Sequence, residues 1–161
     1  MISIVAYKGE KMYSFILAVH NILRWVAIIL AIVALARAYS GWLGRRDWTA
    51  TDRKIGVFFG SAMDLQLLLG LILYIVLSPT TRTAFSDFGA AMRIADVRFF
   101  ALEHILYMVV AIVLVHVGTA AARKATQAVD KHRRAAIWFS LAGLALLLGM
   151  PWFRPWLPGL G

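Results

Sequence analysis

Four long apolar stretches constrain this chain more than any other feature of its sequence. They cover residues 13 to 38, 57 to 78, 99 to 121 and 135 to 152. A helix needs about 20 residues to cross about 30 Å of hydrocarbon, because each residue adds about 1.5 Å. The stretches therefore predict a single domain with an all-α fold, in which four helices form an integral membrane bundle of up-down topology.

The composition points in the same direction. Hydrophobic residues make up 61% of the chain and charged residues 16%, against about half and about a quarter in soluble proteins. This excludes a soluble enzyme and a nucleic-acid-binding protein, so the net charge of +9 is better explained by loops that touch anionic membrane lipid. The chain has no cysteine, which excludes iron–sulfur clusters, thiolate zinc sites and covalently attached c-type haem.

Ten basic side chains gather in two of the loops and predict the orientation of the helices. They are Arg37, Arg45, Arg46, Arg53, Lys54, Arg123, Lys124, Lys131, Arg133 and Arg134. The opposite side has six, namely Lys8, Lys11, Arg82, Arg93, Arg98 and Arg154. Since loops rich in Lys and Arg stay in the cytoplasm, we predict both termini outside, in a multi-pass protein of the bacterial inner membrane.

The sequence also indicates the character of three segments outside the four spans. The first eleven residues have the character of a dispensable tail. The outer loop of residues 79 to 98 is long for a connection between two helices, and we expect a short surface helix at about residues 84 to 94. The fourth helix is expected to end at three prolines, Pro151, Pro155 and Pro158.

Ionisable side chains within the predicted spans are the best indication of function. A charge near the bilayer centre costs at least about 2.5 to 3.5 kcal/mol, so it is retained where it has a partner or a role. The residues are His20, Arg24, Asp64, Glu103, His104 and His116. His20 lies about seven residues into the first span and His104 about five into the third. Both spans run inward, so the two imidazoles reach a similar depth near the outer face.

A b-type haem needs two axial imidazoles at one level, on opposite sides of the porphyrin. His20 and His104 therefore predict a haem b site, with the haem iron as the bound metal. Arg24, one turn below His20, has two candidate partners: a haem propionate or Glu103 on the third helix. The alternative for all four residues is a structural polar network, since hydrogen-bonded side chains are common where transmembrane helices pack.

Asp64, His116 and His132 form a secondary set toward the cytoplasmic end. Asp64 and His116 lie at a similar depth and predict a hydrogen-bonded couple or an element of a proton relay. His132 lies among Lys131, Arg133 and Arg134, where a charged face at the water interface is expected. The alternative is that His132 pairs with His116 and holds a second haem near the cytoplasm.

Six blocks of sequence, in order, carry a resemblance to a known family. The blocks are residues 12 to 15 (MYSF), 20 to 25 (HNILRW), 41 to 44 (GWLG), 65 to 74 (LQLLLGLILY), 98 to 104 (RFFALEH) and 151 to 154 (PWFR). From Met12 to the C-terminus the chain resembles small four-helix bacterial membrane proteins that are labelled cytochrome b-like. The resemblance implies a b-type haem but no particular reaction. Relatives often have histidine at the position of Asp64, so it favours the outer haem site here.

These observations predict a membrane-bound electron-transfer protein with one b-type haem, acting as a subunit of a larger respiratory or photosynthetic complex. Quinone or quinol is the expected redox partner, together with other membrane subunits. No catalytic group with its base and no phosphate-binding loop marks a complete enzyme. One alternative is a cofactor-free accessory subunit. Another is a copper-handling protein, but Met63, Met108 and Met150 form no clustered motif in the sequence.

Overall fold

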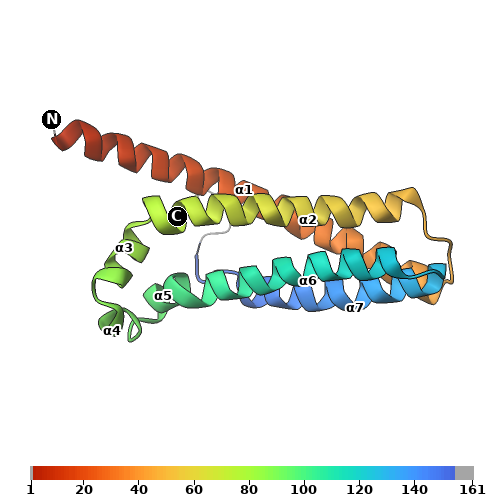
Figure 1. Ribbon diagram of the computed structural model, residues 1–161. Coiled ribbons are helices and arrows are strands. Elements are labelled where there is room, and N and C mark those ends of the chain that lie inside the picture. Colours follow the sequence, from red (N-terminus) through yellow and green to blue (C-terminus); the bar gives the residue numbers. More distant parts are fainter. Residues whose placement is uncertain (1, 155–161) are drawn as a thin grey trace.

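The computed structural model describes residues 2 to 154, with side chains from residue 9 onward, and the regular secondary structure of that range is all helical (Figure 1). This confirms the predicted all-α class. The four long helices are α1 (Ile2–Leu43), α2 (Ala50–Leu71), α6 (His104–Lys124) and α7 (Ala128–Leu148). They pack in cyclic order, α1 on α2, α2 on α6, α6 on α7 and α7 on α1.

Three helical segments of the described chain are long and apolar enough to cross a membrane: Gly9–Leu43, Ala50–Leu77 and Ala95–Lys124. They cover three of the four predicted spans, except for Ser78 at the end of the second. The fourth prediction, residues 135 to 152, falls on α7, which does not have this character over its full length. The reason is that α7 begins with a polar segment that includes Asp130, Lys131 and Arg133. Only its second half is continuously apolar.

Helices also form in the segments outside the predicted spans. The N-terminal segment, expected as a dispensable tail, continues α1 as helical backbone from Ile2. No proline interrupts these residues, so nothing in the backbone prevents the helix. The sequence predicts one short helix near residues 84 to 94, and the structure has three short helices in this loop. The helices of the outer loop are α3 (Pro79–Ser86), α4 (Phe88–Ala91) and α5 (Ala95–Arg98). The side chain of Ser78 caps the start of α3, and that of Asp87 caps the start of α4.

Small side chains form much of the interface between the four long helices. The buried core includes Ala27, Ala31, Ala34 and Ala38 of α1, together with alanines of α6 and α7. Gly118 of α6 lies directly under α7, where an added Cβ would come within 2.7 Å of Trp138 Cβ. Small residues allow helix backbones to approach closely, and close packing is the main attraction between helices in lipid.

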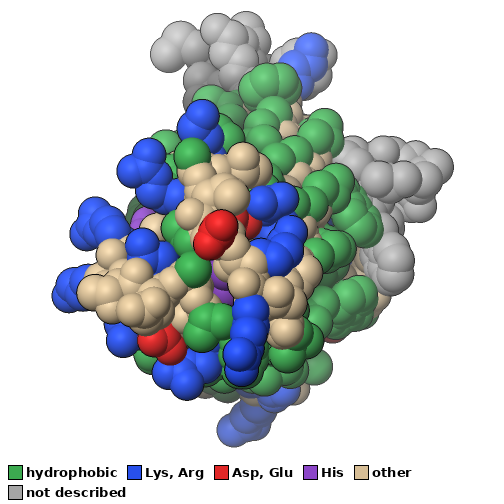
Figure 2. Space-filling model, turned by 90° about the vertical axis from the view of Figure 1, so that its right-hand side faces the viewer, with side chains coloured by type: hydrophobic (Ala, Val, Ile, Leu, Met, Phe, Trp, Pro, Cys, Tyr) green, Lys and Arg blue, Asp and Glu red, His purple; other side chains and the backbone are tan. Residues whose placement is uncertain are grey.

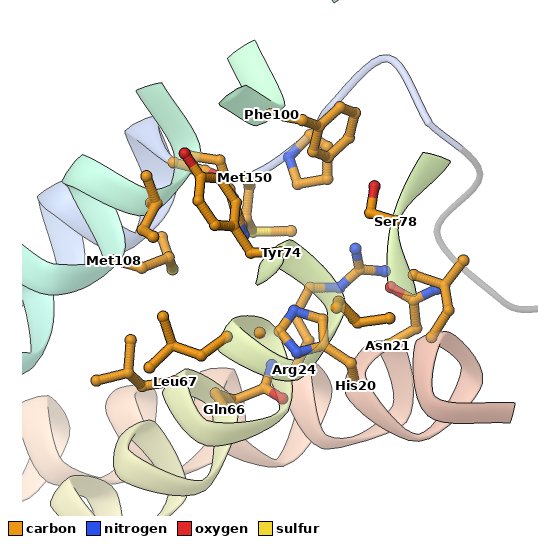
Figure 3. A pocket seen from close by; sticks show the side chains of 18 of the residues that line it. His20, Asn21, Arg24, Gln66, Leu67, Tyr74, Ser78, Phe100, Met108 and Met150 are labelled. Carbon is orange, nitrogen blue, oxygen red and sulfur yellow. The ribbon is translucent and has the colours of Figure 1, made fainter. Parts of the chain in front are cut away.

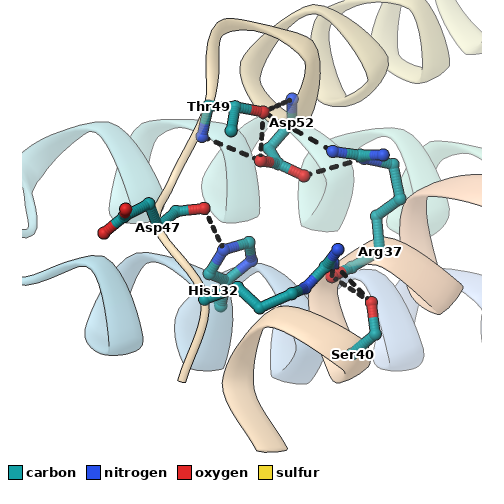
Figure 4. A network of polar contacts seen from close by, with 7 residues as sticks. Arg37, Ser40, Asp47, Thr49, Asp52 and His132 are labelled. Atoms are coloured by element: carbon teal, nitrogen blue, oxygen red, sulfur yellow. Dashed lines mark hydrogen bonds and ion pairs between the residues drawn. The ribbon is translucent and has the colours of Figure 1, made fainter. Parts of the chain in front are cut away.

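The two basic loops lie at the same end of the molecule, where α1 leads into α2 and α6 leads into α7 (Figure 1). Figure 2 shows Lys and Arg side chains gathered on that end. A polar network closes it (Figure 4): Arg37 Nε donates to Asp52 Oδ1 at 2.8 Å, and Thr49 and Asp52 cap the start of α2 reciprocally. Arg37 is therefore an ion-pair partner within the fold as well as part of the basic loop.

His132 does not form the charged face predicted for it. Its side chain is completely buried at the basic end, in contact with the Trp48 ring at a centroid distance of 4.8 Å. Its Nε2 lies 3.4 Å from the carbonyl oxygen of Asp47 (Figure 4). Gly41 of α1 makes this burial possible, because a Cβ at that position would overlap the imidazole ring.

Candidate functional site

A cavity of about 400 Å³ lies between the four long helices, in the half of the molecule away from the basic loops. Figure 3 shows side chains that line it. Cofactor sites commonly have volumes of about 300 to 1,000 Å³ and are mostly apolar, with a few polar groups. The lining of this cavity fits that description. Its polar and ionisable members include His20, Asn21, Arg24, Gln66, Tyr74, His104 and Arg154.

His20 of α1 and His104 of α6 meet at this cavity. Their ring centroids are 6.4 Å apart and the ring planes cross at 72°. Two imidazoles that bind one metal ion from opposite sides, each through a nitrogen about 2 Å from the metal, have ring centroids about 6 Å apart. The separation of the two rings is therefore compatible with a shared metal ion between them.

His104 is oriented by the end of α7. Its Nδ1 lies 2.7 Å from the carbonyl oxygen of Gly149. A carbonyl only accepts, so Nδ1 carries the proton and donates, and in the neutral ring Nε2 keeps its lone pair. Histidines that bind metals almost always donate their second ring N–H in this way. Gly149 permits the close approach, because a Cβ there would lie 2.8 Å from Tyr107 Cβ.

His20 has an unusual environment for a buried imidazole. Its Nδ1 is buried and has no hydrogen-bond partner within the described part of the chain. Most buried polar atoms in proteins are hydrogen-bonded, so such an atom calls for an explanation. Gly70 of α2 lies beside the ring, and an added Cβ there would make an ordinary contact of 3.5 Å with His20 Cε1.

Two π-helical segments shape the outer part of the cavity, and the sequence analysis did not find either. They are η1 (Ile72–Leu77), which continues α2, and η2 (Phe99–Glu103), which leads into α6. The Tyr74 hydroxyl of η1 donates to the Ala101 carbonyl of η2 at 2.5 Å, which ties the two segments together. Tyr74 and Phe100 both line the cavity. Such turns occur often at functional sites, and no proline or glycine within either segment signals them here.

Two arginines line the cavity, but Glu103 does not. Arg24 lies beside His20 (Figure 3), and Arg154 contributes a second guanidinium, 5.1 Å from the centre of the Phe100 ring. Arg154 was not among the predicted site residues. Glu103 forms an ion pair with Arg98 at 2.6 Å, outside the cavity. The i to i+5 spacing of a π-helix explains this contact, because it places residues 98 and 103 on one face.

Three methionines that are far apart in the sequence come together in the structure. Met63, Met108 and Met150 all line the same cavity as His20 and His104. Their spacing along the chain gives no sign of this convergence, because each comes from a different element. Within the described residues no group of three or more His, Cys, Asp or Glu side chains is close enough to hold a metal ion. A haem needs only two protein ligands.

The secondary candidates lie elsewhere. Asp64 and His116 form the predicted hydrogen bond, with Asp64 Oδ1 2.8 Å from His116 Nε2. Their side chains are about half exposed, on the outer surface of α2 and α6. His132 is buried near the basic end and contacts Asp47 and Trp48. His116 and His132 thus have separate partners.

Comparisons of the chain with protein-family models, with curated proteins and with solved structures found no match.

Proposed function

We propose that this protein is a membrane-bound b-type haem protein that transfers electrons, with His20 and His104 as the axial ligands. One observation carries the proposal: the two imidazoles meet at a cavity of about 400 Å³ with their ring centroids 6.4 Å apart. The unpartnered Nδ1 of His20 and the hydrogen bond from His104 to Gly149 support it, because both suit rings prepared to bind a metal.

The other lining residues fit the remaining parts of a haem. Burying the carboxylate of a haem propionate is costly unless a positive charge pairs with it. Arg24 and Arg154 would supply that positive charge. Met63, Leu67 and Ile112 supply apolar surface that excludes water. A bound haem supplies one-electron chemistry, while the protein contributes the ligands, their orientation and the low polarity that tunes the potential.

The proposed setting is the bacterial inner membrane. All four long helices, α7 included, would cross it as an up-down bundle with both termini outside. The basic loops at one end support this orientation, because such loops stay in the cytoplasm. Quinone or quinol is the proposed redox partner, and a respiratory or photosynthetic complex the proposed assembly.

The test of this orientation is single-cysteine labelling, since the chain has no cysteine of its own. Cysteine in place of Ser86, in the exposed outer segment, should react with a membrane-impermeant thiol reagent in intact cells. Cysteine in place of Thr126, which is equally exposed between the basic helix ends, should react only after the cells are opened. The reverse pattern would place the cavity near the cytoplasmic face.

The test of the haem site is the absorption spectrum of the full chain, purified after expression with ample haem. We expect about one non-covalent haem per chain and a low-spin spectrum, because two imidazole ligands give a strong ligand field. A pyridine haemochrome assay on the same sample measures the ratio of haem to protein. A folded preparation that remains colourless would contradict the proposal and favour the cofactor-free accessory subunit.

A second candidate function is favoured by the three methionines. Thioether and imidazole groups are suitable ligands for Cu(I), and Met63, Met108 and Met150 line the same cavity as the two histidines. A Cu(I) site would give no absorption band in the visible spectrum. Elemental analysis of the colourless protein, with about one copper per chain as the positive result, would distinguish this function from an accessory subunit without a cofactor.

A further inference from the structure

The couple formed by Asp64 and His116 faces away from the other helices. Asp64 belongs to the candidate membrane span Ala50–Leu77 and His116 to the span Ala95–Lys124. Their side chains are 50% and 54% exposed, although the bond between them is short, at 2.8 Å. Ionisable residues within membrane spans almost always face the interior of a bundle or a water-filled cavity. An outward-facing couple therefore requires something other than lipid to cover it.

The surface around the couple consists of two exposed stripes at helical spacing. The α2 stripe contains Val57, Ser61, Asp64 and Leu68, and the α6 stripe contains Val109, Val113, His116 and Val117. We call these eight residues the α2–α6 face. The hydroxyl of Ser61 adds a third polar group within one turn of Asp64. The remaining residues are apolar and mostly β-branched, and such side chains lose little rotamer freedom when a second helix packs on them.

The bond within the couple leaves hydrogen-bonding capacity on both partners. It uses one carboxylate oxygen of Asp64 and Nε2 of His116. In the described part of the chain, Asp64 Oδ2 and His116 Nδ1 have no further partner. The Nδ1 edge of the ring lies over Gly60, where an added Cβ would be 3.9 Å from Nδ1 and 3.6 Å from Cε1. These are ordinary contact distances, and the His116 side chain is 54% exposed.

We propose that the α2–α6 face binds a second copy of this chain, with the Asp64–His116 couples of the two copies side by side at the interface. A two-fold axis along the membrane normal reverses every direction in the membrane plane, so His116 of one copy lies opposite Asp64 of the other. Each His116 ring then lies between two carboxylates, with Nε2 at Asp64 of its own chain and Nδ1 toward Asp64 of the second copy. The two imidazoles and the two carboxylates form one closed set of polar contacts.

A second copy fits this face better than an unrelated partner does. The face carries both a donor and an acceptor, so it is complementary to itself, as an isologous interface requires. A different membrane protein would need its own matching pair of polar groups at the same depth. The α2–α6 face contains neither His20 nor His104, so the dimer and the haem site are tested independently of each other.

The test uses single cysteines in the otherwise cysteine-free full chain, in native membranes. Ser61→Cys and Val113→Cys each lie within one turn of the couple, close to the proposed axis. We expect each to form a disulfide-linked dimer when copper phenanthroline and oxygen oxidise the two thiols, since a disulfide needs Cα atoms within about 7 Å. The matched controls are Ile32→Cys on α1 and Leu144→Cys on α7, which are 61% and 54% exposed on other helices and should stay monomeric.

A double variant tests whether the polar couple is responsible. Asp64→Leu with His116→Leu removes the polar atoms and keeps an apolar surface, and we expect the cross-linked fraction to fall about tenfold, since the hydrogen bonds between the two copies are lost. Arg98→Leu with Glu103→Leu removes an ion pair elsewhere and should leave the yield unchanged. Absence of cross-linking at both Ser61→Cys and Val113→Cys in folded protein would overturn the proposal. So would cross-linking to a different protein, or an undiminished yield in the Leu pair.

Discussion

Alanine in place of His20 or of His104 is expected to abolish the low-spin haem spectrum. Each histidine is proposed to supply one of two axial ligands, so its loss leaves the iron five-coordinate or releases the haem. Both variants should fall from about one haem per chain with a low-spin spectrum to a high-spin spectrum or to no bound haem. Absorption spectroscopy of the purified variants, with electron paramagnetic resonance of the oxidised form, measures the change.

The matched control is His116→Ala. His116 lies in the same helix as His104, but its ring is bonded to Asp64 outside the cavity and is half exposed. This variant should keep both the haem content and the low-spin spectrum. If His116→Ala removes the haem while His104→Ala retains it, then the ligands are not the two histidines of the cavity. Gel filtration of every variant in the same detergent establishes that the comparison is between folded proteins.

Gly41→Ala is expected to destabilise the protein strongly, although it adds a single methyl group. The new Cβ would overlap three atoms of the His132 ring. The imidazole cannot easily move aside, because it is completely buried and packs against Trp48. Forcing extra atoms into a filled interior costs about 1 to 3 kcal/mol, and sometimes more. The free energy of unfolding in detergent, from denaturant titration followed by circular dichroism, should fall by at least this amount.

Gly143→Ala of α7 is the matched control for this change. Its added Cβ would lie 3.7 Å from Leu35 Cδ1, an ordinary contact. Because alanine favours a helix over glycine by about 1 kcal/mol, this variant should be as stable as the parent protein or more so. Gly41→Ala combined with His132→Ala should recover part of the lost stability, because the double change removes the overlap. Equal stability of Gly41→Ala and Gly143→Ala would mean that His132 does not occupy the described position.

Some contacts of the candidate site residues could be predicted from the sequence, and others could not. The pairing of His20 with His104 was predictable, because counting residues along two helices of the same direction gives their relative depth. The contact of Asp64 with His116 was predictable for the same reason. Glu103 was not, because a π-helical turn changes the number of residues per turn and directs its side chain toward Arg98.

Hydropathy and helical periodicity are local properties, so the sequence by itself determined the all-α class, the long apolar helices and the two basic loops at one end. Convergence of distant residues is not local. Only the tertiary structure decided that Met63, Met108 and Met150 share a cavity with two histidines, and that Arg154 joins Arg24 there. It also decided the burial of His132, which depends on the space that Gly41 leaves on a different helix. The physical reason is that packing between helices, and not the character of the neighbours in sequence, sets the environment of each side chain.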